Sequence, residues 1–337
     1  MGSGVAGRNQ AAFLRMPTVA TGNRGDNDGL SGTEPATLVI RNRDSGFFSN
    51  FNAVVDCLVH RVGRAGVAAV RVDWRAPERH SQFPYGTEAD GNLWDAFFEP
   101  LSFPSFPART VETDTFMNFA MTGRNAYGFY KLRRGWRQQY HRAYSKYVRP
   151  KSRILDKVER IHWSGLDGHY CVGAHWRHSD HDSENLFRIP DPEVFIARLR
   201  KLLPGDRSWR VFLATDNQAA VSAFEGAFGD RLVVQPGVSR AEGRSETQFH
   251  HGHSDPSTAL GEEVLVDCLL LARCDALLHV TTNIATAVGY INPDLKMIYC
   301  EAPYQAAIGY LWAIGRTAGA IFRHRLRILL EHKRAYD

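Results

Sequence analysis

Short apolar runs alternate with segments of helical periodicity over most of the chain. The first run, TLVIR, is typical of a strand, and it is followed by apolar positions at helical spacing between residues 51 and 62 and by a second strand at VAAVRVDW. Ser49 or Asn50 is the expected N-cap of the intervening helix, and Gly66 its C-cap. A strand, a helix and a second strand form a βαβ unit, so the pattern predicts a parallel sheet.

The alternation becomes regular after Gly168. Strands are expected at HYCVGAHWR, WRVFLATD, RLVVQ, ALLHV and KMIYC, with helices between them over 191–203, 217–228 and 257–273 and from Thr282 onward. This order is typical of a doubly wound, Rossmann-like domain. Ahead of it, residues 75–109 are loop-rich apart from a short helix near 92–98, and helical patterns return over 126–147 and 151–162.

These patterns divide the chain into four parts. Residues 1–34 have no sustained apolar period and are expected to form a flexible tail. Residues 35–165 and 166–303 are expected to form two Rossmann-like domains, and residues 304–337 a long helical segment that packs back across both. A chain of 337 residues with 44% hydrophobic residues can bury the cores of two such domains.

Charge and cysteine content narrow the class of protein. The net charge of +5 comes from 41 basic and 36 acidic residues, an excess too small to indicate nucleic-acid binding by itself. The basic run between residues 131 and 153 suits a solvated helix face or a site for an anionic ligand or a membrane surface. Five cysteines lie scattered in apolar stretches, which indicates buried reduced thiols in a cytosol-like compartment.

No apolar run reaches the length of a membrane span. Arg273 and Asp275 interrupt the run over 264–280, and Arg316 interrupts the C-terminal one. The N-terminus also lacks the succession of charged, apolar and small residues of a signal peptide. We therefore expect a cytoplasmic protein with no membrane span and no nucleic-acid partner.

Ligands of an open parallel sheet bind beyond the carboxyl ends of its strands, so the residues after each strand are the first candidates for a site. Four clusters meet this criterion, at residues 44–52, 175–184, 215–217 and 281–283, with Glu262 and Asp267 on the helix that leads to the last of them. The first cluster is a glycine-containing loop without the GxGxxG spacing of dinucleotide binders or the GxxxxGK[ST] of the P-loop. Dehydrogenase and ATPase functions are thereby disfavoured.

The second cluster, GAHWRHSDHDSEN, has the composition of a diphosphate site. His175 and Arg177 alternate with Trp176 and so share one face of a strand. Arginine offers a planar fork to phosphate oxygens, and histidine can donate to a bridging or leaving oxygen. The alternative is a metal site or a structural polar patch, because four residues of the following loop are metal ligands by type: His178, Asp180, His181 and Asp182. Their tight spacing in one loop matches no standard metal site.

The third and fourth clusters suit a nucleotide. Asp216 follows a strand and is placed to bind a base or a ribose, although a residue beside a helix cap is often only part of that cap. Thr281, Thr282 and Asn283 put two hydroxyls and an amide at a helix N-terminus, where free N–H groups and the helix dipole favour a phosphate. Asp267 lies in the otherwise apolar stretch VDCLLLA, so it needs a partner if it is buried.

The order of these elements resembles a known enzyme family. SGFFSNFNAVVDCLVHRVGRAG, followed by a strand that ends in VDWR, is similar to the opening of the bacterial nodulation α1,6-fucosyltransferases. GAHWRHSD resembles the H-x-R segment of those enzymes and of the eukaryotic α1,6- and protein O-fucosyltransferases. FLATD and LVDCLLLARCDALLHVTTNIATAV are similar to the two remaining motifs, so the resemblance extends in order over residues 37–300.

The resemblance implies a GT-B fold, an α/β architecture in which two Rossmann-like domains face each other across a cleft, the acceptor-side domain first and the donor domain second. It implies GDP-fucose as the donor, a glycan-like acceptor, inversion at the anomeric carbon, and neither a cofactor nor a metal. It assigns the diphosphate to His175 and Arg177, the nucleoside to Asp216 and Asp267, and the phosphates to Thr282 and Asn283. Thr281 and the first-loop residues Gly46, Asn50 and Asn52 complete the expected donor contacts.

This chain departs from the family pattern in two places. The family often carries a second arginine where His178 stands, and the region around Tyr85 has no close counterpart, which leaves the identity of the acceptor open. Two alternative functions therefore stay open: a GT-B transferase for another nucleotide sugar, and a catalytically degenerate nucleotide-binding module of the same fold.

The expected chemistry needs two kinds of group. Fucosyl transfer develops positive charge on the sugar ring and negative charge on the departing diphosphate. Arg177, His175 and the N–H groups of the helix that begins near Thr282 can neutralise the second charge without a metal. Glu184 is the first candidate for the base that accepts the proton of the acceptor hydroxyl, and Glu262 is the second.

Overall fold

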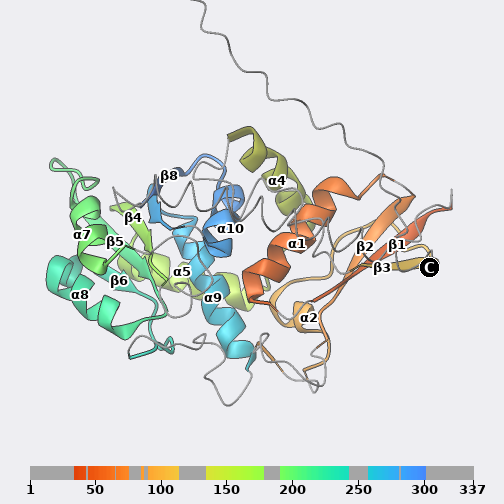
Figure 1. Ribbon diagram of the computed structural model, residues 1–337, viewed down its shortest axis with the longest axis horizontal. Coiled ribbons are helices and arrows are strands. Elements are labelled where there is room, and N and C mark those ends of the chain that lie inside the picture. Colours follow the sequence, from red (N-terminus) through yellow and green to blue (C-terminus); the bar gives the residue numbers. More distant parts are fainter. Residues whose placement is uncertain are drawn as a thin grey trace, which may run out of the picture.

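The chain forms a mixed α/β structure with two parallel sheets, shown as a ribbon in Figure 1. The computed structural model describes residues 34–42, 45–64, 66–75, 85–86, 90–113, 134–177, 190–242, 257–280 and 282–300. The expected tail over 1–34 lies outside these residues apart from its last one, and so does the C-terminal helical segment over 304–337.

The larger sheet is doubly wound, as the sequence predicts. Its strand order is β6-β5-β4-β7-β8, and all neighbours are parallel. The strands are β4 (Tyr170–His175), β5 (Trp209–Ala214), β6 (Leu232–Val234), β7 (Ala276–His279) and β8 (Lys296–Tyr299). The chain thus builds outward from β4 to one edge and then returns to build from β7 to the other edge. The order reverses between β4 and β7, which is where such sheets bind ligands.

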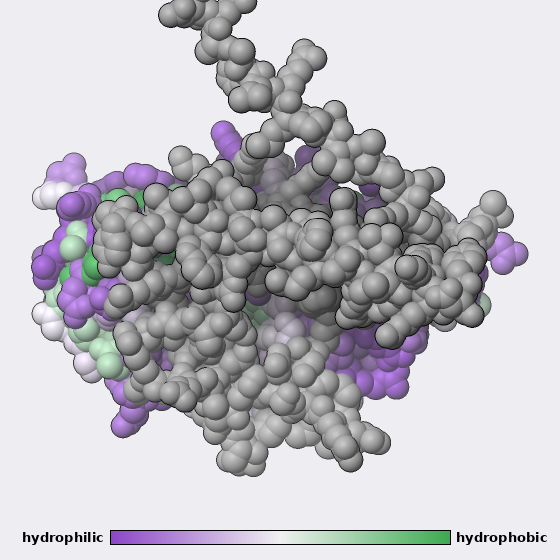
Figure 2. Space-filling model, viewed as in Figure 1, coloured by the Kyte–Doolittle hydropathy of each residue, from purple (hydrophilic) through white to green (hydrophobic). Residues whose placement is uncertain are grey.

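Helices cover both faces of this sheet. On one face α7 (Pro192–Arg200) and α8 (Gln218–Phe228) pack on alternate strand residues such as Val172, Val211 and Leu278. On the other face lie α5 (Ser152–Gly165), α9 (Thr258–Leu271) and α10 (Asn283–Ile291), as Figure 1 shows. The surface over α7 and α8 mixes hydrophilic and single hydrophobic residues in Figure 2, as expected for the solvent side of a globular domain.

The smaller sheet has the order β2-β1-β3, again with parallel neighbours. Its strands are β1 (Ala36–Arg41), β2 (Val67–Asp73) and β3 (Thr110–Thr113). The βαβ unit β1-α1-β2, with α1 at Phe47–His60, confirms the sequence prediction. Strand β3 was missed, because four residues in a loop-rich region give too little alternation to be recognised.

Helix α1 begins and ends earlier than we expected. Its N-cap is Gly46, not Ser49 or Asn50, and its C-cap is Arg61, while Gly66 belongs to the turn that follows. The reason is burial, because the rings of Phe47 and Phe48 enter the core from the first turn of the helix. Our two capping predictions for this helix are therefore wrong.

A shared hydrophobic core joins the two sheets. It extends from β1 and β2 through α1, α2 (Leu93–Phe97), α4 (Arg134–Tyr147), α5, α9 and α10 to one face of the larger sheet. Phe51 of α1 illustrates the connection, since its ring stacks at 5.1 Å on Phe98 after α2 and at 6.4 Å on Tyr290 of α10. Two separate domains that face each other across a cleft remain a prediction.

The basic run around α4 is largely engaged with other parts of the protein. Arg137 is buried and donates to the carbonyl of Leu295 at 2.9 Å and to that of Pro293, just after the end of α10. Arg134 pairs with Asp294 at 2.8 Å, and further along the run Lys151 pairs with Glu99. Within the described part of the run, several basic side chains thus attach helices rather than form a free cationic face.

Arg137→Ala is expected to lower the free energy of unfolding by about 2 kcal/mol, because one buried and one partly buried carbonyl lose their donor. Urea denaturation followed by circular dichroism measures this change. Arg142→Ala, on the exposed side of the same helix, is the matched control and should shift stability by less than about 0.5 kcal/mol. Equal stability of the two variants would contradict an anchoring role for Arg137.

The described residues test the expectations about the cysteines and about membrane-spanning helices. The cysteines at positions 57, 171, 268, 274 and 300 are all buried and free of disulfides, as predicted. Burial raises the pKa of the Cys171 thiol to about 11 and that of the Cys57 thiol to about 12, so both stay protonated at neutral pH. Among the described helices, none is long and apolar enough to cross a membrane.

Candidate functional site

The carboxyl ends of three neighbouring strands bring three of the predicted clusters together. Strands β5, β4 and β7 end in register, with His175 opposite both Ala214 and His279. Arg177 follows β4, Asp216 follows β5, and Thr282 follows β7. The sequence placed these residues on separate strands, and the sheet order makes them neighbours at the point where the strand order reverses.

His175 is fixed by the cap of α10. Its side chain is buried, and its Nδ1 lies 3.0 Å from Oγ1 of Thr282. The same Thr282 oxygen accepts a hydrogen bond from the N–H of Ala285 at 3.0 Å, as an N-cap residue does. In the tautomer that carries the imidazole proton on Nε2, the hydroxyl of Thr282 donates to Nδ1. In this tautomer Nε2 can donate to a phosphate oxygen.

Arg177 and Asp216 form a loose ion pair across the same edge. Arg177 Nε lies 3.8 Å from Asp216 Oδ2, and both side chains are mostly but not fully buried, with exposed fractions of 24% and 11%. A distance of this length keeps the guanidinium close to the carboxylate without the short bidentate geometry of a tight pair. The pair therefore holds a cation beside His175 at the strand ends.

The start of α10 adds a third group to this edge. Thr282 is its N-cap, and the first N–H groups of a helix have no partner within the helix. Those N–H groups and the positive end of the helix dipole favour an anion. Asn283 is the first helical residue, and Thr281 lies outside the described residues.

Asp267 lies on α9 beside the end of β6, in a second polar cluster. Its carboxylate accepts from the amide of Gln235 at 2.8 Å when that amide is oriented to satisfy its neighbours. Burial raises the pKa of Asp267 to about 8, opposed by the nearby charge of Arg240 and assisted by that of Glu263. Gln235 is the partner that the sequence required for a buried aspartate, although its identity was not predicted.

The loop after β6 connects the two aspartates of the expected nucleoside site. Ala241 donates through its N–H to the carbonyl of Asp216 at 2.8 Å and accepts from the N–H of Gln218 at 2.8 Å. Arg240, next to it, carries the charge that acts on Asp267, and donates to the carbonyl of Gln235 at 3.1 Å. Asp216 and Asp267 thus border the same loop from different elements.

The first loop leads into α1 as expected, but its asparagines have partners within the protein. Asn50 donates to the carbonyl of Ser45 at 2.9 Å and is buried. Asn52 is also buried and contacts Asn283 of α10. Gly46, the N-cap, has open space where a side chain would begin, so this position is accessible from outside.

Of the two candidate bases, the structure describes Glu262 but not Glu184. Glu262 lies on α9 in ion pairs with Arg153 and with Lys157 of α5, the latter at 3.3 Å. A carboxylate held by two cations is a weaker proton acceptor, so this geometry does not favour Glu262 as the base. Glu184 lies outside the described residues, together with the possible metal ligands His178, Asp180, His181 and Asp182. In the part of the chain that is described, no group of three or more ligand-type side chains could hold a metal ion.

Sequence reasoning missed His279. It ends β7 directly beside His175 in the register, and its Nδ1 donates to the carbonyl of Val280 at 2.9 Å. Burial lowers its pKa to about 4, so the ring is neutral at physiological pH. The sequence ALLHV predicts a strand that ends near a histidine, which was the available signal for His279. We considered only the residues that follow this strand as site candidates.

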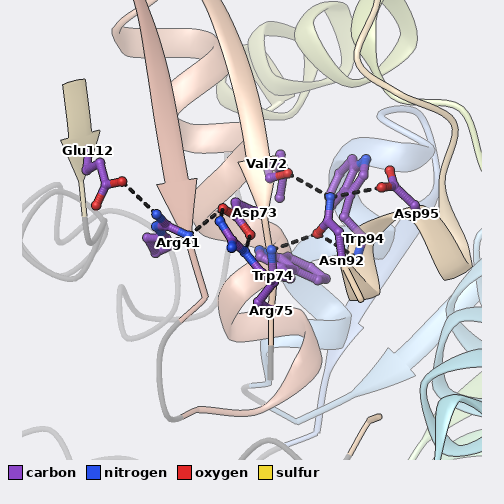
Figure 3. A network of polar contacts seen from close by, with 9 residues as sticks. All are labelled: Arg41, Val72, Asp73, Trp74, Arg75, Asn92, Trp94, Asp95 and Glu112. Carbon is purple, nitrogen blue, oxygen red and sulfur yellow. Dashed lines mark hydrogen bonds and ion pairs between the residues drawn. The ribbon is translucent and has the colours of Figure 1, made fainter. Parts of the chain in front are cut away.

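Sequence reasoning also gave no role to the edge of the smaller sheet, drawn in Figure 3. Arg41 at the end of β1 donates to Glu112 of β3 at 2.6 Å and to Asp73 at the end of β2. Arg75 donates to Asp73 through Nε at 2.8 Å, and this bond holds the pKa of that carboxyl below its usual range. In the sequence, VDWR was used only as part of the resemblance to the fucosyltransferases. Asp73 nevertheless lies at the carboxyl end of a parallel strand, where ligands of such sheets bind.

Asn92 closes this edge onto the core. Its side-chain oxygen accepts from the N–H of Trp74 at 2.8 Å, and its amide donates to the carbonyl of Val72 at 3.0 Å and to Asp95 at 3.0 Å, as Figure 3 shows. Asn92, the N-cap of α2, thus holds Val72 and Trp74 at the end of β2 against the start of that helix.

Comparison with known proteins gives solved structures as matches. No protein-family model and no curated protein matches the chain. The NodZ α1,6-fucosyltransferase of Bradyrhizobium, soaked with GDP-fucose, matches over 77% of this chain and 93% of that chain at 18% identity, with a TM-score of 0.46. A mutant of Arabidopsis thaliana FUT1 in complex with GDP matches over 81% and 72% at 12% identity, with a TM-score of 0.44.

A third match is POFUT1 in complex with GDP, over 80% of this chain and 100% of that chain at 10% identity, with a TM-score of 0.44. These proteins are of the fucosyltransferase superfamily that the sequence motifs resemble.

Proposed function

We propose that the chain is an inverting glycosyltransferase that moves L-fucose from GDP-fucose to a hydroxyl of a glycan-like acceptor. The observation that carries this proposal is the meeting of Arg177, His175 and the N-terminus of α10 where the strand order of the larger sheet reverses. A cation, an imidazole that can donate through Nε2 and the N–H groups of a helix start are together the donors that a diphosphate needs.

In the proposed mechanism these groups stabilise the leaving group. The bond from the fucose anomeric carbon to the diphosphate oxygen breaks, and the GDP oxygen takes the electron pair. Arg177 neutralises the charge that develops, and His175 donates its Nε2 proton in a hydrogen bond. Because the donors are held by strand ends and by a helix cap, they need little rearrangement as the charge grows. This chemistry does not require a metal.

The nucleoside is assigned to the second polar cluster. An ionised Asp267 offers two acceptor oxygens, which match the adjacent N–H donors of guanine, and we assign the ribose to Asp216. Because burial raises the pKa of Asp267 to about 8, the carboxylate at neutral pH is favoured by donors that surround it. A guanine supplies those donors, whereas uracil offers one N–H between two carbonyls.

The acceptor hydroxyl attacks from the face opposite the leaving group, with its proton passed to a base. Glu184 follows the Arg177 strand and is the residue we assign to this role, while Glu262 is the alternative. We assign the acceptor to the side of the smaller sheet, whose carboxyl edge carries the charges of Arg41 and Asp73.

A direct test is to supply GDP-fucose with a panel of glycan acceptors and to follow GDP release and the product by NMR. The proposal predicts GDP release that depends on an acceptor and a product linkage of inverted anomeric configuration. Activity with UDP- or ADP-sugars instead would support a transferase for another nucleotide sugar. GDP binding without any turnover would support the catalytically degenerate alternative.

Turnover is expected to continue in excess EDTA, because protein donors take the place of a metal at the diphosphate. The measurement is the initial rate of GDP release after dialysis against chelator. A loss of activity that Mn²⁺ or Mg²⁺ restores would contradict the prediction, and would make His178, Asp180 and Asp182 the first candidates for ligands.

A further inference from the structure

Asn52 makes a three-point connection between α1 and α10. Its amide nitrogen donates to the backbone carbonyl of Asn283 at 3.0 Å and lies 3.3 Å from the side-chain oxygen of the same residue. Its side-chain oxygen accepts from the hydroxyl of Tyr290 at 2.8 Å. The side chain of Asn52 is 1% exposed. We had expected Asn52 to contact the nucleotide-sugar donor, but both polar atoms of its side chain are already hydrogen-bonded to α10.

The two partners of Asn52 lie on one face of α10. Asn283 and Tyr290 are seven residues apart, which is about two helical turns, and helical side chains lean toward the N-terminus. The Tyr290 hydroxyl therefore reaches back to the first turn, where Asn283 begins the helix. Asn52 thus acts on the first turn of α10 from the side.

That first turn carries the groups of the proposed diphosphate site. Thr282, adjacent to Asn283, caps the helix and hydrogen-bonds to His175 at 3.0 Å. A continuous chain of hydrogen bonds and backbone therefore leads from α1 through Asn52, Asn283 and Thr282 to His175. A displacement of the helix start by a fraction of an ångström would move both the free N–H groups and the hydroxyl that orients the imidazole.

We infer that Asn52 is a positioning residue that fixes the start of α10 relative to His175, and so sets the geometry of the diphosphate site from the smaller-sheet side of the molecule. The inference rests on the proposed function for its effect on nucleotide binding. It differs from simple helix packing, which would add stability but would leave the orientation of His175 unchanged.

The test uses a double variant that removes the connection and keeps the core apolar. Asn52→Leu removes the buried amide and Tyr290→Phe removes the hydroxyl that donates to it. The double variant therefore leaves neither of these two polar groups buried without a partner. Tyr290→Phe alone is the matched control, because it keeps the bond from Asn52 to the Asn283 carbonyl. A cooperative melt confirms that each full-length variant is folded before any other measurement.

Two readouts follow. Calorimetric titration with GDP should show affinity at least about tenfold weaker in the double variant and within about twofold of wild type in the control. The ¹⁵N NMR signals of the His175 ring, assigned with His175→Gln, should shift in the ligand-free double variant and stay in place in the control. A structural role alone would lower the melting temperature and move neither readout.

The second readout separates this inference from the proposed function. If wild type binds no nucleotide, the proposed function fails, and the ligand-free spectrum of His175 still decides the role of Asn52. A folded double variant with unchanged His175 signals overturns the inference, whether or not GDP binds. A shifted His175 signal supports it.

Discussion

Arg177→Ala is expected to reduce fucosyl transfer by at least about 100-fold while the protein remains folded. The guanidinium lies at the strand ends, paired loosely with Asp216 and partly exposed, so its loss removes leaving-group stabilisation rather than core packing. Arg177→Lys should recover little of the rate, because one ammonium cannot reproduce a planar fork of N–H donors. The measurement is kcat for GDP release, with melting temperature as the test of folding.

The matched control for this substitution is Arg210→Ala. Arg210 belongs to β5 but lies near its amino end, where it donates to the carbonyl of Asp230 at 2.9 Å. It should keep transfer within about twofold of wild type, because ligands bind at the carboxyl end of the sheet. Near-normal turnover in Arg177→Lys would contradict the assignment of Arg177 to the diphosphate site. A loss of turnover in Arg210→Ala as large as that in Arg177→Ala would contradict it as well.

Asp267→Asn is expected to weaken GDP binding strongly. In the absence of GDP, the variant is expected to be more stable than wild type at neutral pH. The folded-state pKa of about 8 lies above the ordinary value of 3.8, so between those values the folded protein holds a proton that the unfolded chain has lost. Stability therefore falls as pH rises from about 4 to about 8. Asparagine has no such proton to lose, so the variant lacks this decline.

The pH dependence supplies the control for Asp267→Asn. At pH 5 the wild-type carboxyl is protonated in the folded state, so the two proteins should differ less in melting temperature than at pH 8. In the proposed site the carboxylate binds guanine, so wild-type GDP affinity should rise as pH approaches 8 and then level off, whereas the affinity of the variant should stay low throughout. A GDP affinity of the variant equal to that of wild type would exclude Asp267 from the nucleoside site.

Much of the larger sheet was predictable because its signals are local. Each strand is a short apolar run, and each helix after it begins with a recognisable cap, such as Asn217 for α8 and Thr282 for α10. The rule that parallel strands present ligands at their carboxyl ends then selected His175, Arg177 and Asp216 before their spatial relation was known. Sequence alone did not give the pairing of His175 with Thr282, which depends on β4 and β7 being neighbours.

The smaller sheet and the helices between the sheets were less predictable. Phe47 and Phe48 extended α1 beyond the expected cap because burial of two aromatic rings outweighs the preference for a polar N-cap residue. The partners of Asn52 and of Arg137 lie more than 150 residues away in the chain, so no local pattern identifies them. Long-range hydrogen bonds of this kind are specified only by the assembled core.

The central claim is that the end of the larger sheet is a binding site for a guanosine diphosphate. Calorimetric titration of the full-length protein with GDP, UDP and ADP in the presence of EDTA tests it most directly. The account predicts one GDP site per chain, at least about tenfold tighter than either UDP or ADP, and lost in Arg177→Ala. Absence of GDP binding, or equal affinity for the three nucleotides, would contradict it.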